Sequence, residues 1–155
     1  MKNLSWILVV ILSIIVALFA YKFTAGSVAP SNDGRQAVII SKDERNALLL
    51  EMRTWLMSAQ GVLVAANKED LAAVSKIARV SGMAAEEETP GSLFRKIPLE
   101  MKKLGFATRA RFDDIAVMAE EGKDSKEILA LLGDTMNNCI ACHAMYTFEE
   151  EAPAK

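Results

Sequence analysis

The chain has 155 residues, of which 52% are hydrophobic, and its 18 basic and 20 acidic side chains give a formal net charge of −2. This apolar content excludes a disordered chain, and the slightly acidic balance argues against a general nucleic-acid-binding protein, which needs a basic surface. Two cysteines form at most one disulfide bond, which excludes a disulfide-rich protein. A single histidine excludes any site with two histidine ligands from this chain.

The first 25 residues (1–25) predict a membrane anchor or a signal peptide. Residues 4–20 carry no charge, and a helix of this length reaches about 26 Å, close to the thickness of a bilayer's hydrocarbon core. Lys2 precedes this segment, so the amino end is expected in the cytoplasm and the rest of the chain is exported. A cleaved signal peptide is the alternative, although Leu18 blocks a small-x-small cleavage site that ends at Ala20.

Both alternatives put the domain outside the cytoplasm. It is expected either on the periplasmic side of the bacterial inner membrane, anchored by residues 4–20, or soluble in the periplasm. Residues 26–40 are expected to form a flexible linker, because the cluster from Pro30 to Gly34 is rich in turn-forming residues and has no periodicity. No segment alternates with a period of two for long enough to predict a strand.

Residues 41–148 have the pattern of a helical domain, followed by an acidic tail at 149–155. Ser41 and Glu44 form a capping box, in which the hydroxyl accepts from a backbone amide and the carboxylate reaches back. Apolar residues then recur at steps of three and four, which indicates one buried face. This stripe consists of Leu48, Met52, Trp55, Ala59, Val62 and Ala66. The helix is expected to end at Asn67, which would also cap the next helix.

Three further helices follow in the predicted domain. The second ends near Gly82 and precedes a charged, turn-prone break at 86–91. The third is expected from about Pro98 to Gly122, and Asp124 begins the fourth. Four helices with short connections predict an all-α fold, an antiparallel four-helix bundle.

The fourth helix carries a CxxCH motif formed by Cys139, Cys142 and His143. At positions i, i+3 and i+4 of a helix, these three side chains face the same way. Two thiols can form thioethers with the two vinyl groups of one porphyrin, and the imidazole then lies where it can bind the iron as proximal ligand. Both cysteines of the chain and its only histidine fall within these five residues, which predicts one covalently bound haem c.

Other uses of the motif fit less well. A zinc site normally has four protein ligands, and no further cysteine or histidine exists to join these three. A thioredoxin-type dithiol needs a βαβ context, which the helical pattern does not provide. A disulfide between Cys139 and Cys142 is conceivable in an exported protein, but it leaves His143 without a role.

A helical bundle with CxxCH near its carboxyl end resembles the class II c-type cytochromes, the cytochrome c-prime family. The resemblance covers residues 41–148 and includes Tyr146, three residues after the histidine, where this family often has an aromatic residue. The chain departs from the family at Thr147, where members often carry Arg or Lys. The resemblance implies a haem protein with no enzymatic activity, and it suggests a homodimer.

The resemblance also concerns the distal side of the iron. In low-spin relatives a methionine of the first helix is the sixth ligand, whereas in cytochrome c-prime itself an apolar residue screens an open site. Met52 lies on the apolar stripe and is the candidate distal ligand or screen, and ordinary core packing remains an alternative. Leu49 is the alternative apolar screen. Met57 lies about 140° farther round the helix and should point elsewhere.

Two functions follow from these expectations. The first is electron transfer by a monohaem c-type cytochrome at the membrane, with redox proteins as partners and without catalytic residues. The second is binding of NO or CO at a five-coordinate haem. A purely structural, membrane-tethered bundle is a more distant third. A basic cluster in the third helix region either docks an acidic redox partner or is a solvated helix face. It comprises Arg95, Lys96, Lys102, Lys103, Arg109 and Arg111.

Overall fold

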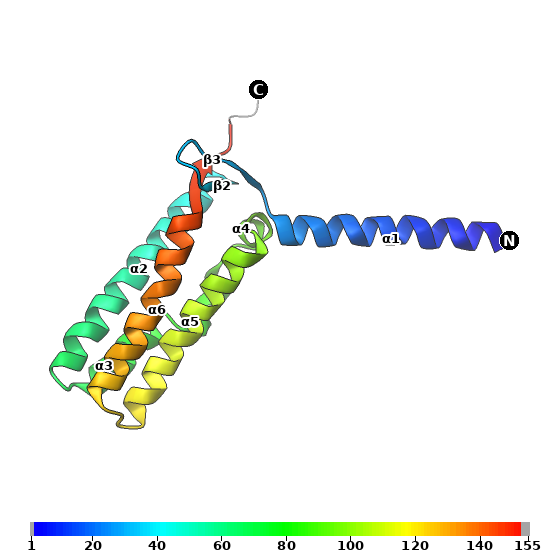
Figure 1. The fold of residues 1–155 in the computed structure, drawn as a ribbon. Helices are drawn as coiled ribbons and strands as arrows, with labels where there is room; N and C mark the ends of the chain where they lie inside the picture. Colours follow the sequence, from blue (N-terminus) through cyan, green and yellow to red (C-terminus); the bar gives the residue numbers. More distant parts are fainter. Residues whose placement is uncertain (1, 153–155) are drawn as a thin grey trace.

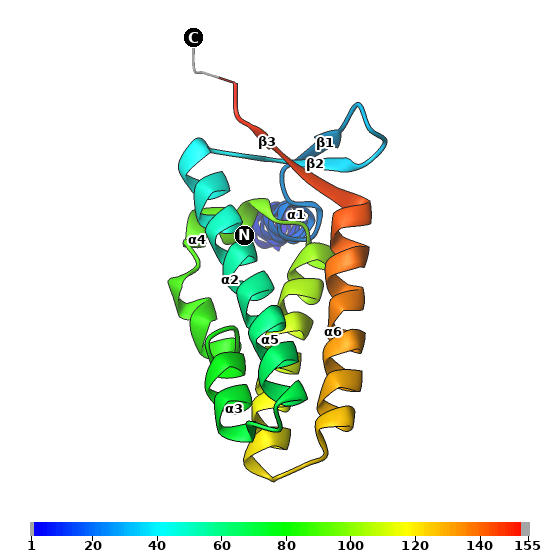
Figure 2. The same cartoon turned by 90° about the vertical axis from the view of Figure 1, so that its left-hand side faces the viewer.

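The computed structural model describes residues 2–152, apart from the side chains of residues 2–5 and 86–88. It is an antiparallel helical bundle from which a long apolar helix projects (Figure 1), so the predicted fold class is confirmed. Neighbouring helices around the bundle run in opposite directions, in the order α2, α3, α5 and α6 (Figure 2). The helices of the bundle and the projecting helix are α1 (Lys2–Ala25), α2 (Lys42–Asn67), α3 (Leu71–Arg79), α5 (Leu99–Glu120) and α6 (Ser125–Met145).

Local capping signals define the helix ends. The Ser41 hydroxyl accepts from the Glu44 amide at 3.3 Å and the Glu44 carboxylate accepts from the Ser41 amide at 2.8 Å, so the predicted capping box is present. Asp124 caps α6 as expected. Asn67 does end α2, but the prediction that it caps the next helix is wrong, because Asp70 accepts from the third residue of α3.

The helical segment between α2 and α5 is interrupted. α3 has only nine residues, and a 3₁₀ turn, η1 (Met83–Glu88), and the short helix α4 (Gly91–Lys96) complete the return to α5. Within the described residues, the buried apolar side chains accordingly form two clusters. One joins α2, α3, α5 and α6 at the end of the bundle where α3 lies, and the other lies at the opposite end, around α4.

A small sheet closes the second end of the bundle, where α2 begins and α6 ends (Figure 2). β2 (Gln36–Ile40) lies between β1 (Val28–Pro30), which is antiparallel to it, and β3 (Tyr146–Glu150), which is parallel. Val38 and Ile40 of β2 are fully buried.

The sheet corrects two sequence predictions. Residues 26–40 are not a linker without regular structure, and the acidic tail predicted at 149–155 begins inside β3, while residues 153–155 lie outside the described part. The strands were missed because they are short and because β2 pairs with the far end of the chain. A local pattern of period two cannot report such a distant partner.

The projecting helix is long and apolar enough to cross a membrane, and its side chains from Trp6 onward are largely exposed. Its length and composition fit a membrane anchor or a signal sequence. Its last turn is attached to the bundle. Lys102 Nζ donates to the Phe23 carbonyl at 3.0 Å and lies over the rings of Phe23 and Phe94, at 3.9 and 4.7 Å from their centroids.

The residues after α1 are also bonded to the bundle. The Ser27 amide donates to the Lys96 carbonyl at 2.7 Å. Gly26 has a φ of 68°, and a Cβ at this position would collide with the backbone of residues 96–98, so only glycine fits here. The joint between α1 and the bundle is therefore packed and hydrogen-bonded.

A three-membered ion pair ties the sheet end of the bundle together. Lys96 Nζ lies 2.7 Å from a carboxylate oxygen of Glu44 and 2.6 Å from one of Glu151, the residue that follows β3. Burial by itself would raise the pKa of Glu44, but the hydrogen bonds from Lys96 and from the Ser41 amide outweigh it and lower the pKa to about 2.

This shift predicts how acid destabilises the bundle. A carboxyl whose pKa is lowered on folding contributes stability above its unfolded value, near 4.5, and loses it as the pH falls towards 2. We expect Glu44→Gln to cost about 2 kcal/mol at pH 7 and to flatten the loss of stability below pH 4.5. Urea unfolding of wild type and variant at pH 7, 5 and 3 measures the free energy of unfolding and its dependence on pH. Glu100→Gln, which removes an exposed carboxylate, is the control, and equal pH slopes for Glu44→Gln and wild type would contradict the prediction.

Candidate functional site

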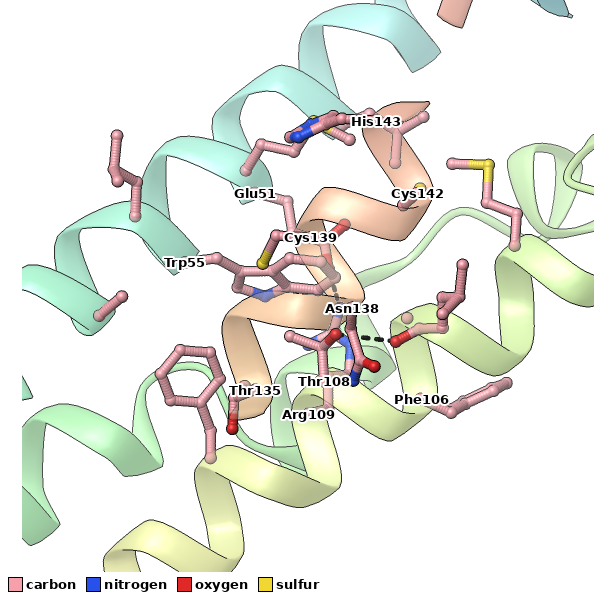
Figure 3. A pocket seen from close by; sticks show the side chains of 18 of the residues that line it. Glu51, Trp55, Phe106, Thr108, Arg109, Thr135, Asn138, Cys139, Cys142 and His143 are labelled. Atoms are coloured by element: carbon pink, nitrogen blue, oxygen red, sulfur yellow. Dashed lines mark hydrogen bonds and ion pairs between the residues drawn. The ribbon is translucent and has the colours of Figure 1, made fainter. Parts of the chain in front are cut away.

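A cavity of about 500 Å³ separates the two apolar clusters of the bundle (Figure 3). It opens where α3 has ended, between α2, α5, α6 and the α4 segment. Leu48 and Met101 of one cluster and Phe112 and Leu132 of the other lie in its walls. Its volume is within the range of about 300–1,000 Å³ that is usual for cofactor and ligand sites.

The CxxCH residues lie on one wall of this cavity. Cys139, Cys142 and His143 all line it from the last two turns of α6, with both cysteines partly buried and His143 exposed at the rim (Figure 3). The structure thus brings together the three side chains that the i, i+3, i+4 spacing placed on one helix face.

The surroundings of both sulfurs are apolar. Cys139 and Cys142 are free thiols, and burial raises the pKa of each. For Cys142 the pKa reaches about 11, because the neighbouring Cys139 adds to the effect of burial. Thiols that act as redox or nucleophilic groups instead lie in electropositive surroundings that lower the pKa.

A second wall of the cavity is formed by α2. Leu49, Met52 and Trp55 all line it, so the predicted distal residue and its alternative border the same space as the CxxCH residues. Met57 points away, with 72% of its surface exposed, as the helical geometry predicts. Met52 and His143 therefore border the same space from different helices.

A charged pair with a buried arginine supports this wall. Arg109 of α5 is 2% exposed, forms an ion pair with Glu51 of α2, and lies with its guanidinium carbon 5.5 Å from the centroid of the Trp55 ring (Figure 3). The guanidinium holds the indole from one side by a cation–π contact, which fixes a flat aromatic surface at the cavity. The apolar stripe of the sequence includes Trp55, but it gives no sign of this support from Arg109.

The basic cluster predicted in this region is not one continuous surface. Lys102 and Arg109 are buried, and Lys96 is engaged by two carboxylates. Lys102 and Arg109 are seven residues apart on α5, which puts them on the same side of the helix, and Thr108 and Phe112 of that side are also buried. Lys102, Arg109 and the apolar Phe112 recur at steps of seven and three, and this spacing is the signal that could have separated the buried basic residues from the exposed ones.

Gly105 leaves room on the α5 wall. It lines the cavity in the interior of a helix, and a Cβ at this position would meet no other atom within 4 Å. Glycine costs about 1 kcal/mol relative to alanine inside a helix. The open space beside it is what a bulky planar group would need.

These residues fit a covalently bound haem. Two thiols and an imidazole of α6 and a thioether side chain of α2 line the same cavity, and most of the lining is apolar. Among the described side chains, those of residues 6–85 and 89–152, no three or more Cys, His, Asp or Glu are grouped as a site for a bare metal ion. A porphyrin brings its own four nitrogen ligands and requires only axial ligands from the protein.

Comparison of the chain with protein-family models, with curated proteins and with solved structures found no match. The resemblance to the cytochrome c-prime family therefore stays an expectation drawn from the motif and the helical pattern.

Proposed function

We propose that this chain is a monohaem c-type cytochrome that transfers electrons on the exported side of a membrane. One observation carries the proposal: the only two thiols and the only imidazole of the chain line the same wall of an apolar cavity that divides the core of the bundle. In this proposal Cys139 and Cys142 hold haem c through thioethers, and His143 is the proximal iron ligand.

Other residues that line the cavity also have roles in this proposal. Met52, which lines the same cavity from α2, is the distal ligand or a screen of the distal side. Trp55, held by Arg109, supports the plane of the cofactor, and Leu48, Met101 and the other apolar lining residues exclude water. When bound, haem supplies a one-electron couple between ferric and ferrous iron, and the protein sets its potential through axial ligation and burial.

The location in the cell is part of the proposal. Lys2 precedes the apolar stretch of α1, and this charge distribution favours an amino end in the cytoplasm and an exported bundle. We expect the bundle on the periplasmic side of a bacterial inner membrane, whether α1 stays as an anchor or is removed as a signal peptide. Its partners there are redox proteins at or near the membrane.

A gas-binding haem protein is the second candidate. Leu49 lines the same wall as Met52, so an apolar side chain is also in place to screen an open sixth position. The two candidates differ in what occupies the sixth position, and this difference is visible in the absorption spectrum.

The test is expression of the full chain in a host that matures c-type haem. We expect a protein that keeps its haem stain after denaturation, shows a low-spin ferric spectrum, and does not change when CO is added to the reduced form. A high-spin spectrum with rapid CO binding would instead establish the gas-binding candidate. Colourless protein, or haem that leaves on extraction with acidified organic solvent, would overturn the proposal.

A further inference from the structure

The side chain of Arg35 reaches from the β1–β2 hairpin to the end of α6. Its Nη1 donates to the carbonyl oxygen of His143 and to that of Tyr146, each at 3.1 Å. These carbonyls belong to the end of α6, where backbone acceptors have no partner within the helix. A guanidinium at this end also compensates the negative pole of the helix.

Arg35 is itself held in place from its other side. Its Nε donates to Asp33 at 2.8 Å, its Nη2 lies 2.6 Å from the same carboxylate, and its backbone amide donates to the other carboxylate oxygen at 3.1 Å. The next residue, Gln36, pairs with Tyr146 in the β2–β3 ladder. The backbone on both sides of the guanidinium is therefore fixed relative to the end of α6.

We propose that Arg35 is a positioning residue for His143, and that its charge raises the reduction potential of the haem. The inference rests on the proposed function, and it follows from the two hydrogen bonds to the end of α6. A guanidinium that fixes the backbone of His143 restricts the orientation of the imidazole. Arg35 and Asp33 together carry no net charge, so loss of Arg35 would leave the Asp33 carboxylate uncompensated beside the end of α6. That negative charge would favour the ferric state, which carries one positive charge more than the ferrous state.

The test compares three variants of the full-length holoprotein. Arg35→Ala removes both hydrogen bonds and the charge, and Arg35→Lys restores the charge with a shorter reach. Arg45→Ala is the matched control, because Arg45 contacts β3 through Glu150 at 4.0 Å and bonds to no carbonyl at the end of α6. Haem staining after denaturation first establishes that each protein carries covalent haem. The midpoint potential and the ferric electron paramagnetic resonance spectrum are then measured.

We expect Arg35→Ala to keep its haem stain, to have a lower midpoint potential, and to show shifted or broadened ferric resonance lines. Arg35→Lys should recover part of the potential, and Arg45→Ala should match wild type. If Arg35→Ala is too unstable to purify, Arg35→Gln, which keeps an N–H donor without the charge, takes its place with the same expected fall in potential. A variant with covalent haem and a wild-type potential and spectrum would overturn the inference, whereas absence of covalent haem from wild type would overturn the proposed function.

Discussion

Replacement of both Cys139 and Cys142 by serine is expected to abolish the haem stain of the denatured protein completely. A hydroxyl does not form the thioether bond, so any remaining haem would be bound only through its axial ligands and packing. The double variant should also unfold more easily, because the cavity between the two core clusters would be left unfilled in part of the population. A group that binds only the folded state contributes about 4 kcal/mol at a thousandfold excess over its dissociation constant.

The control is Ile140→Ser, which lies between the two cysteines. Its side chain is 66% exposed and is not among the residues that line the cavity, so the same helix is altered without touching the sulfurs. We expect full haem content and nearly wild-type stability. Denaturing gels stained for haem measure the haem content, and urea unfolding measures the stability. A haem stain that survives in the double serine variant would contradict covalent attachment at these sulfurs.

Substitution Met52→Ala is expected to convert the ferric haem from low spin to high spin and to open the reduced iron to CO. The midpoint potential should fall as well, because an axial methionine raises it. Met52 of α2 and His143 of α6 line the same cavity, so two different helices would offer ligands to one haem. Absorption spectra of both oxidation states, before and after addition of CO, measure the effect.

The matched control is Met57→Ala, since Met57 belongs to the same helix but points into solvent. It should leave the spectra and the potential unchanged. A Met52→Ala protein with an unchanged low-spin spectrum would remove Met52 as a ligand. If wild type is already high spin, the residue acts as a screen, and the variant should then differ from wild type only in its rate of CO binding.

Features that depend on neighbouring residues were predictable from the sequence. The capping box of Ser41 and Glu44 and the cap at Asp124 involve residues only two or three positions apart, and both are present. The shared face of Cys139 and His143 follows from the geometry of one helix, and it places both on the cavity wall. The apolar stripe of α2 likewise identified residues that border the cavity.

Features that depend on distant partners were not predictable. β2 is a strand because β3 lies beside it, and its apolar run alone was not long enough to show a period. The partners of Arg109 and Lys102 were not predictable either, because nothing in α5 reports that Glu51 of α2 and the Phe23 carbonyl of α1 lie against them. The contact of Arg35 with the end of α6 was invisible for the same reason.

The attachment of α1 to the bundle limits how the bundle can move relative to α1. Lys102 donates to the Phe23 carbonyl, and Gly26 packs against the backbone of residues 96–98, so α1 is joined to the bundle without a flexible segment. With α1 embedded, the bundle would keep one side towards the lipid and would revolve only about the membrane normal. Under the proposed function, the electron donor and the electron acceptor would then have to reach the bundle by lateral diffusion. They would meet it at one fixed height above the membrane surface.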